Sequence, residues 1–260
     1  MQMQRWRADG LMALRFFSRL PTGSAPHERP DLARIAPVLP LASCLIGLAP
    51  ALLLALGAQL GLPPNLAAAL ATATLVLVGG AMPEDALADS ADGLFGGQTI
   101  ERRLEIMKDS RHGTYGVAAL CLLLIMRVVA LGSLAGIDPW AAAALWLGAQ
   151  GLARSGALWL TVVLPLARQD GAAAAAGILP LSSFIRGLVL ALLLFGALAW
   201  PTAGWTAIIP AALAAGAVAF GWATLCRRLV GGQTGDLIGA LVALLEIAVL
   251  ATLVSLAPGS

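Results

Sequence analysis

The chain has 260 residues, of which 59% are hydrophobic and only 12% are charged, and its mean hydropathy is +0.87. Soluble domains usually have about a quarter charged residues, so this composition excludes an ordinary soluble protein and indicates helices that pack in lipid. The formal net charge of +2 is too small to indicate binding to nucleic acid. The three cysteines lie in separate apolar runs, which predicts neither disulfides nor a cysteine metal site.

The chain is predicted to be a single all-α membrane domain over residues 1–260. Charges interrupt residues 6–20, which argues against a cleaved signal peptide, and residues 11–20 predict a helix on the membrane surface that ends before Pro21. Seven later runs approach the roughly 20 apolar residues that a membrane-crossing helix needs. They are 35–60, 66–82, 117–134, 140–164, 185–200, 207–226 and 237–256. We therefore expect a polytopic helical bundle with about seven transmembrane helices, six or eight remaining open.

The connecting segments alternate between bare and charged. Segments 61–65, 136–139 and 201–204 carry at most one charge each, whereas all but one of the 16 Lys and Arg residues lie in the N-terminal segment or in 83–116, 154–186 and 227–228. Positive charge prefers the cytoplasmic side of a membrane. The pattern predicts a cytoplasmic N-terminus, an external C-terminus and a charged loop over about 83–116 that faces the cytoplasm.

Acidic side chains gather directly after the second apolar run. Asp85, Asp89 and Asp92 are spaced i, i+4 and i+7, which places them on one helical face, and Glu84 precedes them. Neighbouring anions repel one another, and Mg²⁺ takes one or two carboxylates together with water and substrate phosphate. Because ionisable groups at membrane depth are usually functional, we expect these four residues to bind Mg²⁺ rather than to form a solvated face. The three aspartates are also the predicted catalytic carboxylates.

The next segment contains glycines and then basic residues. Residues 93–97 predict a break in the helix, either a plain turn or a loop whose amides hold phosphate. Residues 101–111 predict an amphipathic helix, in which Lys108 and Arg111 either clamp a diphosphate or pair with acidic neighbours at helical spacing. For Arg102 and Arg103 the pairing interpretation is favoured, although Arg103 stays a candidate. The candidate substrate-binding residues are Arg103, Ser110, Arg111, Arg154, Thr234 and Asp236, and Lys108 is a candidate catalytic residue.

Two charges lie inside predicted spans. Arg127 and Glu246 need partners in the bilayer, and a structural pairing that holds the bundle is favoured over a substrate-facing role. His27 and His112 are isolated and are interpreted as surface residues.

Several segments together resemble the cobalamin synthase family, also called adenosylcobinamide-GDP ribazoletransferases. The specific ones are 84–97, which holds the acidic stripe, and 103–116, which holds Lys-Asp-Ser-Arg; weaker ones are 16–21, 153–154, 167–171 and 231–236. Where the family typically has His before the Glu-Asp pair this chain has Pro83, and where the family has Gly after it this chain has Ala86. Proline suits the start of a helix and alanine favours helix, so we expect the backbone to be kept.

The resemblance implies an Mg²⁺-dependent phosphotransferase in the bacterial cytoplasmic (inner) membrane. It would join α-ribazole or its 5′-phosphate to adenosylcobinamide-GDP, release GMP and complete the nucleotide loop of the corrinoid. Lys108 and Arg111 would hold the diphosphate, with Thr234 and Asp236 contributing from the last loop. Expected partners are these two substrates and membrane lipid, with a homo-oligomer or an association with other cobalamin-assembly enzymes left open.

Three other functions compete with this one. A CDP-alcohol phosphotransferase needs Asp-Gly-x-x-Ala-Arg, but Gly93 is followed here by Leu94-Phe95-Gly96. A prenyltransferase would carry a second Asp-rich motif. A transporter that uses Arg127 and Glu246 as an ion relay would concentrate its charges at mid-membrane, whereas here most charges lie in loops.

Overall fold

The computed structural model describes residues 2–23, 28–109 and 111–257. Within these ranges the chain is helical apart from its loops and one isolated β-bridge between Leu166 and Gln233, which confirms the predicted all-α class. The helices are α1 Gln2–Phe17, α2 Leu32–Ile35, α3 Leu39–Gln59, α4 Pro64–Gly79, α5 Met82–Gly96, α6 Ile100–Ile106, α7 Thr114–Ile137, α8 Pro139–Ala157, α9 Trp159–Val163, α10 Ala172–Ala175, α11 Leu181–Val230 and α12 Gly235–Ser255.

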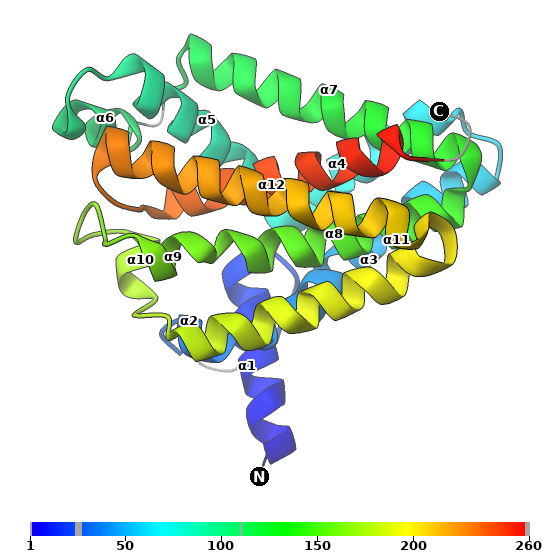
Figure 1. The fold of residues 1–260 in the computed structure, drawn as a ribbon, viewed down its shortest axis with the longest axis horizontal. Coiled ribbons are helices and arrows are strands. Elements are labelled where there is room, and N and C mark those ends of the chain that lie inside the picture. Colours follow the sequence, from blue (N-terminus) through cyan, green and yellow to red (C-terminus); the bar gives the residue numbers. More distant parts are fainter. Residues whose placement is uncertain (1, 24–27, 110, 258–260) are drawn as a thin grey trace.

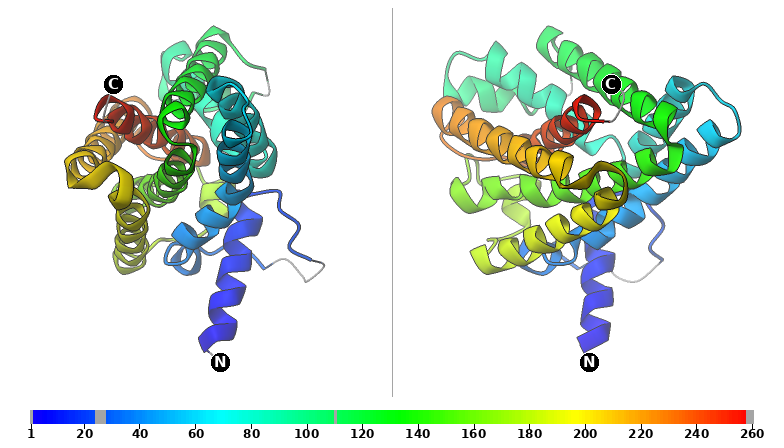
Figure 2. Two further views of the ribbon diagram at one scale, coloured as in Figure 1. Left: turned by 90° about the vertical axis from the view of Figure 1, so that its right-hand side faces the viewer. Right: turned by 45° about the vertical axis from the view of Figure 1, so that its right-hand side comes forward.

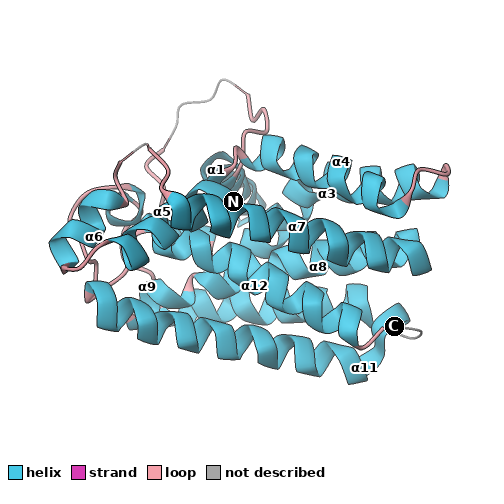
Figure 3. Ribbon diagram, turned by 90° about the horizontal axis from the view of Figure 1, so that it is seen from above, coloured by secondary structure: helices cyan, strands magenta, loops and turns pink. Residues whose placement is uncertain are grey.

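The long helices run roughly side by side, and α1 crosses them (Figure 1). The bare turns and the C-terminus lie at one end of the bundle, whereas α2, α6, α9 and α10 lie at the other, which we call the charged end (Figures 1 and 3). The crosswise direction of α1 suits the predicted surface helix. The bounds of α1 differ from the predicted range 11–20, because the helix begins at Gln2 and ends at Phe17. Its end still lies before Pro21, as predicted.

Four helices of the described ranges are long and apolar enough to cross a membrane, judged by length and composition: α3, α7, α11 and α12. A fifth span arises if α4 and α5, bent by 86° across a short break, are counted together. Helix α11 combines two of the predicted spans, because it turns back on itself at Gly204, whose φ of 61° and ψ of 178° are not helical (Figure 2). The number of seven spans stays a prediction.

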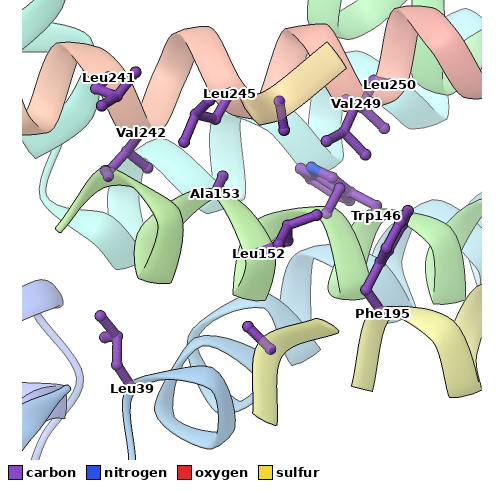
Figure 4. Packing of buried hydrophobic residues seen from close by; sticks show 14 of the residues in the cluster. Leu39, Trp146, Leu152, Ala153, Phe195, Leu241, Val242, Leu245, Val249 and Leu250 are labelled. Atoms are coloured by element: carbon purple, nitrogen blue, oxygen red, sulfur yellow. The ribbon is translucent and has the colours of Figure 1, made fainter. Parts of the chain in front are cut away.

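Helix α8 lies at the centre of the packing. Its Trp146, Leu152 and Ala153 are buried, with Leu241 and Leu245 of α12 on one side and α3 and α11 on the other (Figure 4). The indole of Trp146 is fully buried, and Gly148 allows the ring of Phe195 to approach the backbone, since a Cβ there would lie 2.9 Å from Phe195 Cδ2. Small residues therefore set how closely α8 and α11 pack.

The sequence predicted that the glycines of 93–97 would break the helix, and this prediction is wrong at Gly93. Helix α5 continues to Gly96, and Gly97 is its C-cap. Gly93 lies against Met107 and the Arg103 carbonyl, where a side chain would collide. This glycine therefore serves the packing of α6 on α5, and 93–96 is not a phosphate-holding loop. Helix α6 also ends earlier than predicted, at Ile106, so Lys108 and Arg111 lie outside it.

A sharp turn separates α4 from α5. Gly80 and Ala81 both adopt left-handed backbone angles, with φ of 66° and 57°, and α5 then begins at Met82 with Pro83 in its first turn, as expected for proline. The side chain of Arg19 packs across Gly80, and the backbone N–H of Arg19 donates to the Val78 carbonyl at 2.7 Å. We call residues 79–82 the elbow.

Left-handed geometry is unfavourable for alanine, so Ala81→Gly is expected to stabilise the protein by about 1 kcal/mol. Thermal unfolding in detergent checks this, with Ala73→Gly as the control because Ala73 is an exposed residue inside α4. The control should lower stability by about 1 kcal/mol. Equal losses in both variants would contradict the strained backbone at Ala81.

Helices α5 and α12 approach closely at Ala86. A Cβ added at Gly239 would lie 2.5 Å from the Ala86 methyl group, so the chain tolerates Ala86 because Gly239 faces it. Gly239→Ala is expected to destabilise the protein by about 1–3 kcal/mol through overpacking, and Ala86→Gly/Gly239→Ala should regain most of this loss. A double-mutant cycle on apparent unfolding free energies measures the coupling; simple additivity would show that the two positions are independent.

Candidate functional site

A buried arginine joins three helices. Arg127 of α7 donates from Nη1 to Glu84 Oε1 of α5 at 2.7 Å, and from Nη2 to Glu246 Oε2 of α12 at 2.7 Å. Trp146 of α8 donates from Nε1 to Glu246 Oε1, also at 2.7 Å. All three charged residues are at most 5% exposed. The predicted structural pairing of Arg127 and Glu246 is confirmed, and Glu84, predicted as a metal ligand, lies in this ion-pair cluster.

Asp92, the last aspartate of the stripe, is also bound by other groups of the chain. Asp92 is 7% exposed, and its two carboxylate oxygens accept from the backbone amides of Gly113 and Gly116, at 2.6 and 2.8 Å. These amides lie at the start of α7, where unpaired N–H groups favour an anion. Gly116 leaves room for the carboxylate, because a Cβ there would collide with it. Asp92 thus fastens α5 to the first turn of α7.

Asp85 and Asp89 remain, one helical turn apart. Asp85 is exposed and Asp89 is partly exposed, and neither forms an ion pair with a Lys or Arg residue of the described ranges. His112 Nδ1 lies 3.8 Å from Asp89 Oδ1, which brings a predicted surface residue to the stripe. Asp85, Asp92 and Asp236 all lie near enough to repel the charge on Asp89. This concentration of negative charge favours a bound cation.

A cavity of about 240 Å³ opens beside these carboxylates. Asp85 and Asp236 line it together with Arg154 and Arg168, and Pro83 and Ala86 also line it. The remaining lining is mostly apolar. A concave apolar site with a few converging charged groups is the usual form of a ligand-binding site.

Two arginines, Arg154 and Arg168, line the cavity. Arg154 is 4% exposed and donates from Nη1 to Gln150 Oε1 at 2.9 Å, without an ion-pair partner among the described residues. Arg168 donates from Nη2 to Asp236 Oδ2 at 2.9 Å, while its Nη1 is buried without a hydrogen-bond partner in the described part of the chain. Buried donors that lack partners are costly, and guanidinium groups suit phosphate oxygens. The two side chains therefore provide donors for a phosphate.

The predicted clamp residues lie elsewhere. Lys108 forms an ion pair with Asp170 at 2.5 Å, and Arg111 is 87% exposed and pairs with Asp109 at 2.7 Å. Hydrogen bonding to Lys108 lowers the pKa of Asp170, and hydrogen bonding to Arg111 lowers the pKa of Asp109 to about 2. Both carboxylates therefore stay ionised at neutral pH, and neither basic residue lines the cavity.

Of the other predicted substrate-binding residues, some hold helices together and one lines the cavity. Arg103 donates to the backbone carbonyls of Leu94 and Leu229, at 3.3 and 2.8 Å, so it joins α6 to α5 and α11. Thr234 is the N-cap of α12 and accepts from the Leu237 amide at 3.3 Å. Asp236 lies in the cavity, as described above. Ser110 lies outside the described residues.

The sequence interpretation missed the role of Arg168. The residue stood in segment 167–171 of the resemblance, but no spacing connects it with Asp236, 68 residues further along the chain. The backbone pairing of Ala167 with Gln233, at 2.9 Å, brings the two loops together.

Known proteins resemble this chain along nearly its whole length. The family model for cobalamin-5-phosphate synthase matches residues 9–254. The chain belongs to the cobalamin-5-phosphate synthase family. Similar curated proteins are the adenosylcobinamide-GDP ribazoletransferases of Azorhizobium caulinodans, 44% identical over 96% of both chains, and of Bradyrhizobium diazoefficiens, 42% identical over 94% of this chain and 92% of the relative. The enzyme of the same name from Rhizobium etli is 40% identical over 97% of this chain and 98% of its own. No solved structure matches the chain.

In this member of the cobalamin-5-phosphate synthase family, Asp85 and Asp89 are the carboxylates of the stripe that could hold a metal ion. No group of three or more His, Cys, Asp or Glu residues in the described ranges is arranged to hold a metal ion. Glu84 and Asp92 are occupied by Arg127 and by backbone amides, which leaves Asp85 and Asp89, with Asp236 across the cavity. One or two carboxylates are what Mg²⁺ takes when phosphate oxygens and water complete its shell.

Replacing Arg127 by Met is expected to cost about 3–5 kcal/mol, because Glu84 and Glu246 would be left as unpaired buried charges. The matched control is Arg186→Met, an exposed arginine of α11, which should cost under about 0.5 kcal/mol. Apparent unfolding free energies in detergent measure both. The triple variant Glu84→Gln/Arg127→Met/Glu246→Gln should recover part of the loss, and similar losses for the two single variants would contradict the role of the cluster.

Proposed function

We propose that this chain joins α-ribazole, or its 5′-phosphate, to adenosylcobinamide-GDP and releases GMP. The observation that supports this most directly is the cavity, in which Asp85, Arg154 and the ion pair of Asp236 with Arg168 lie together. Membership of the cobalamin-5-phosphate synthase family supplies the substrates, since the relatives carry the name adenosylcobinamide-GDP ribazoletransferase.

In the proposed reaction a ribose hydroxyl of the acceptor attacks the phosphorus on the cobinamide side of the diphosphate. A new O–P bond forms, the bond from this phosphorus to the bridging oxygen breaks, and GMP leaves with that oxygen. Arg154 and Arg168 would neutralise the phosphates, whereas Asp85 or Asp89 would accept the hydroxyl proton. Arg168 would exchange Asp236 for a phosphate oxygen.

Magnesium is the proposed cofactor. Mg²⁺ would supply charge neutralisation on the diphosphate, held by Asp85 and Asp89, with Asp236 in reach once Arg168 turns to phosphate. Lys108 and Arg111 would act at the rim of the site, where they meet the incoming substrate only by leaving Asp170 and Asp109.

The charged end of the bundle is proposed to face the cytoplasm at the bacterial inner membrane. Arg34 of α2, Arg102 and Arg103 of α6, and Arg168 in the loop between α9 and α10 lie at this end, in agreement with the preference of positive charge for the cytoplasmic side. The site would thus meet its water-soluble nucleotide substrates directly. The transporter alternative loses its basis, because Arg127 and Glu246 are bound to each other.

Asp89→Asn is expected to lower turnover by at least about 100-fold and to raise the Mg²⁺ concentration needed for half-maximal activity, because the charge that holds the metal is lost. GMP release from adenosylcobinamide-GDP and α-ribazole, measured with protein in lipid vesicles, tests this. Asp138→Asn is the control: Asp138 caps α8 at the bare end through the Trp140 and Ala141 amides, and asparagine caps equally well.

Removing Mg²⁺ with a chelator should abolish GMP release from the wild-type protein. Normal turnover of Asp89→Asn with an unchanged Mg²⁺ dependence would remove this residue from the mechanism. No GMP release by the wild-type protein with either acceptor would overturn the proposed function itself.

A further inference from the structure

The cavity has an apolar wall that the proposed chemistry does not use. Phe16 and Phe17, the last residues of α1, line it together with Leu32 of α2. The two rings are half-buried and meet edge to face, with centroids 4.8 Å apart and an angle of 75° between their planes. We call Phe16, Phe17 and Leu32 the apolar wall.

The charged groups of the same cavity come from other elements. Asp85 stands on α5, Arg154 on α8, Asp236 on α12 and Arg168 in the loop before α10. A ligand that fills this space therefore needs an apolar portion joined to a polar or anionic one. A nucleoside with an apolar aromatic base has this form, because its ring is flat and its sugar carries the hydroxyl and phosphate groups.

The size of the cavity limits how large a portion of a substrate it can enclose. At about 240 Å³ it is smaller than the roughly 300–1,000 Å³ of sites that enclose drug-sized ligands. A single bicyclic base with its sugar suits this space, whereas a corrinoid does not. The corrinoid substrate would thus present only its diphosphate to Arg154 and Arg168.

We infer that Phe16 and Phe17 bind the aromatic base of the acceptor nucleoside and determine which base is accepted. This inference rests on the proposed function. The apolar wall presents rings and methyl groups and offers no hydrogen bond to a base edge. It therefore favours the dimethylbenzimidazole of α-ribazole over a purine, whose ring nitrogens and amino group would lose hydrogen bonds to water without replacement.

The test replaces both rings, Phe16→Leu/Phe17→Leu, and keeps the wall apolar. Stacking of a base on an aromatic side chain typically contributes enough that its loss raises KM for α-ribazole by about tenfold. KM for adenosylcobinamide-GDP should stay within about twofold, and the preference for α-ribazole over the corresponding adenine nucleoside should fall. Phe220→Leu is the matched control, since Phe220 is an exposed ring of α11 outside the cavity.

A second variant covers the case in which the leucine protein does not fold. Phe16→Tyr/Phe17→Tyr keeps the rings and adds hydroxyl groups, so KM for α-ribazole should be retained while use of the adenine nucleoside improves. An unchanged KM for α-ribazole in the leucine variant, or an equal change for both bases in the tyrosine variant, would overturn the inference. So would a rise confined to KM for adenosylcobinamide-GDP, which would assign the wall to the corrinoid substrate.

These outcomes separate the inference from the proposed function. Wild-type protein that releases GMP, with leucine and Phe220 variants that behave alike, would overturn the base-binding role and leave the transferase reaction in place. Absence of GMP release by wild-type protein would remove both.

Discussion

Arg127 carries a charge inside the helical bundle, and its hydrogen bonds to Glu84 and Glu246 fix how α5, α7 and α12 face one another. Removing one member would leave buried charge without a partner, so the rotation of α5 about its axis is strongly constrained. Successive residues of a helix point about 100° apart. With Glu84 held toward Arg127, Asp85 necessarily points elsewhere, and it lines the cavity. An ion pair whose members do not line the cavity thus sets the direction of a proposed catalytic carboxylate.

The other end of the acidic stripe is fixed in the same manner. Asp92 is bound by the amides at the start of α7, so α5 is anchored about two turns apart, at Glu84 and at Asp92. Asp85 and Asp89 lie between the anchors, and the close contact of Ala86 with Gly239 brings Asp236 of α12 to the same place. Anchoring on helices therefore holds Asp85, Asp89 and Asp236 close together despite their mutual repulsion, as a preorganised site needs.

The sequence could predict what depends on composition and on local spacing. Apolar runs and the placement of charges indicated the all-α membrane bundle, and the cost of charge in lipid indicated that Arg127 and Glu246 need partners. Spacing alone could not show that Glu84 and Asp92 hold helices together while Asp85 and Asp89 do not. The two pairs differ only in that Glu84 and Asp92 contact residues 21 to 43 positions away in the chain. Arg154 was already a candidate from the sequence, but Arg168 was hidden for the same reason, because it meets Asp236 only where the chain brings two distant loops together. The glycines of 93–97 misled because a glycine inside a helix serves close packing as readily as it serves a turn.

The elbow connects these parts. The backbone of Arg19 is bound to Val78 just before the elbow, so the segment that follows Phe16 and Phe17 is attached where α5 begins. Phe16 and Phe17 of the apolar wall are therefore linked to the carboxylates of α5 through this backbone contact. A left-handed alanine costs about 1–2 kcal/mol, and a straight continuation of α4 would avoid this cost. It would also carry α5 away from α12 and open the cavity between Asp85 and Asp236. The strain at Ala81 is thus compatible with a site whose two halves have to stay at a fixed separation.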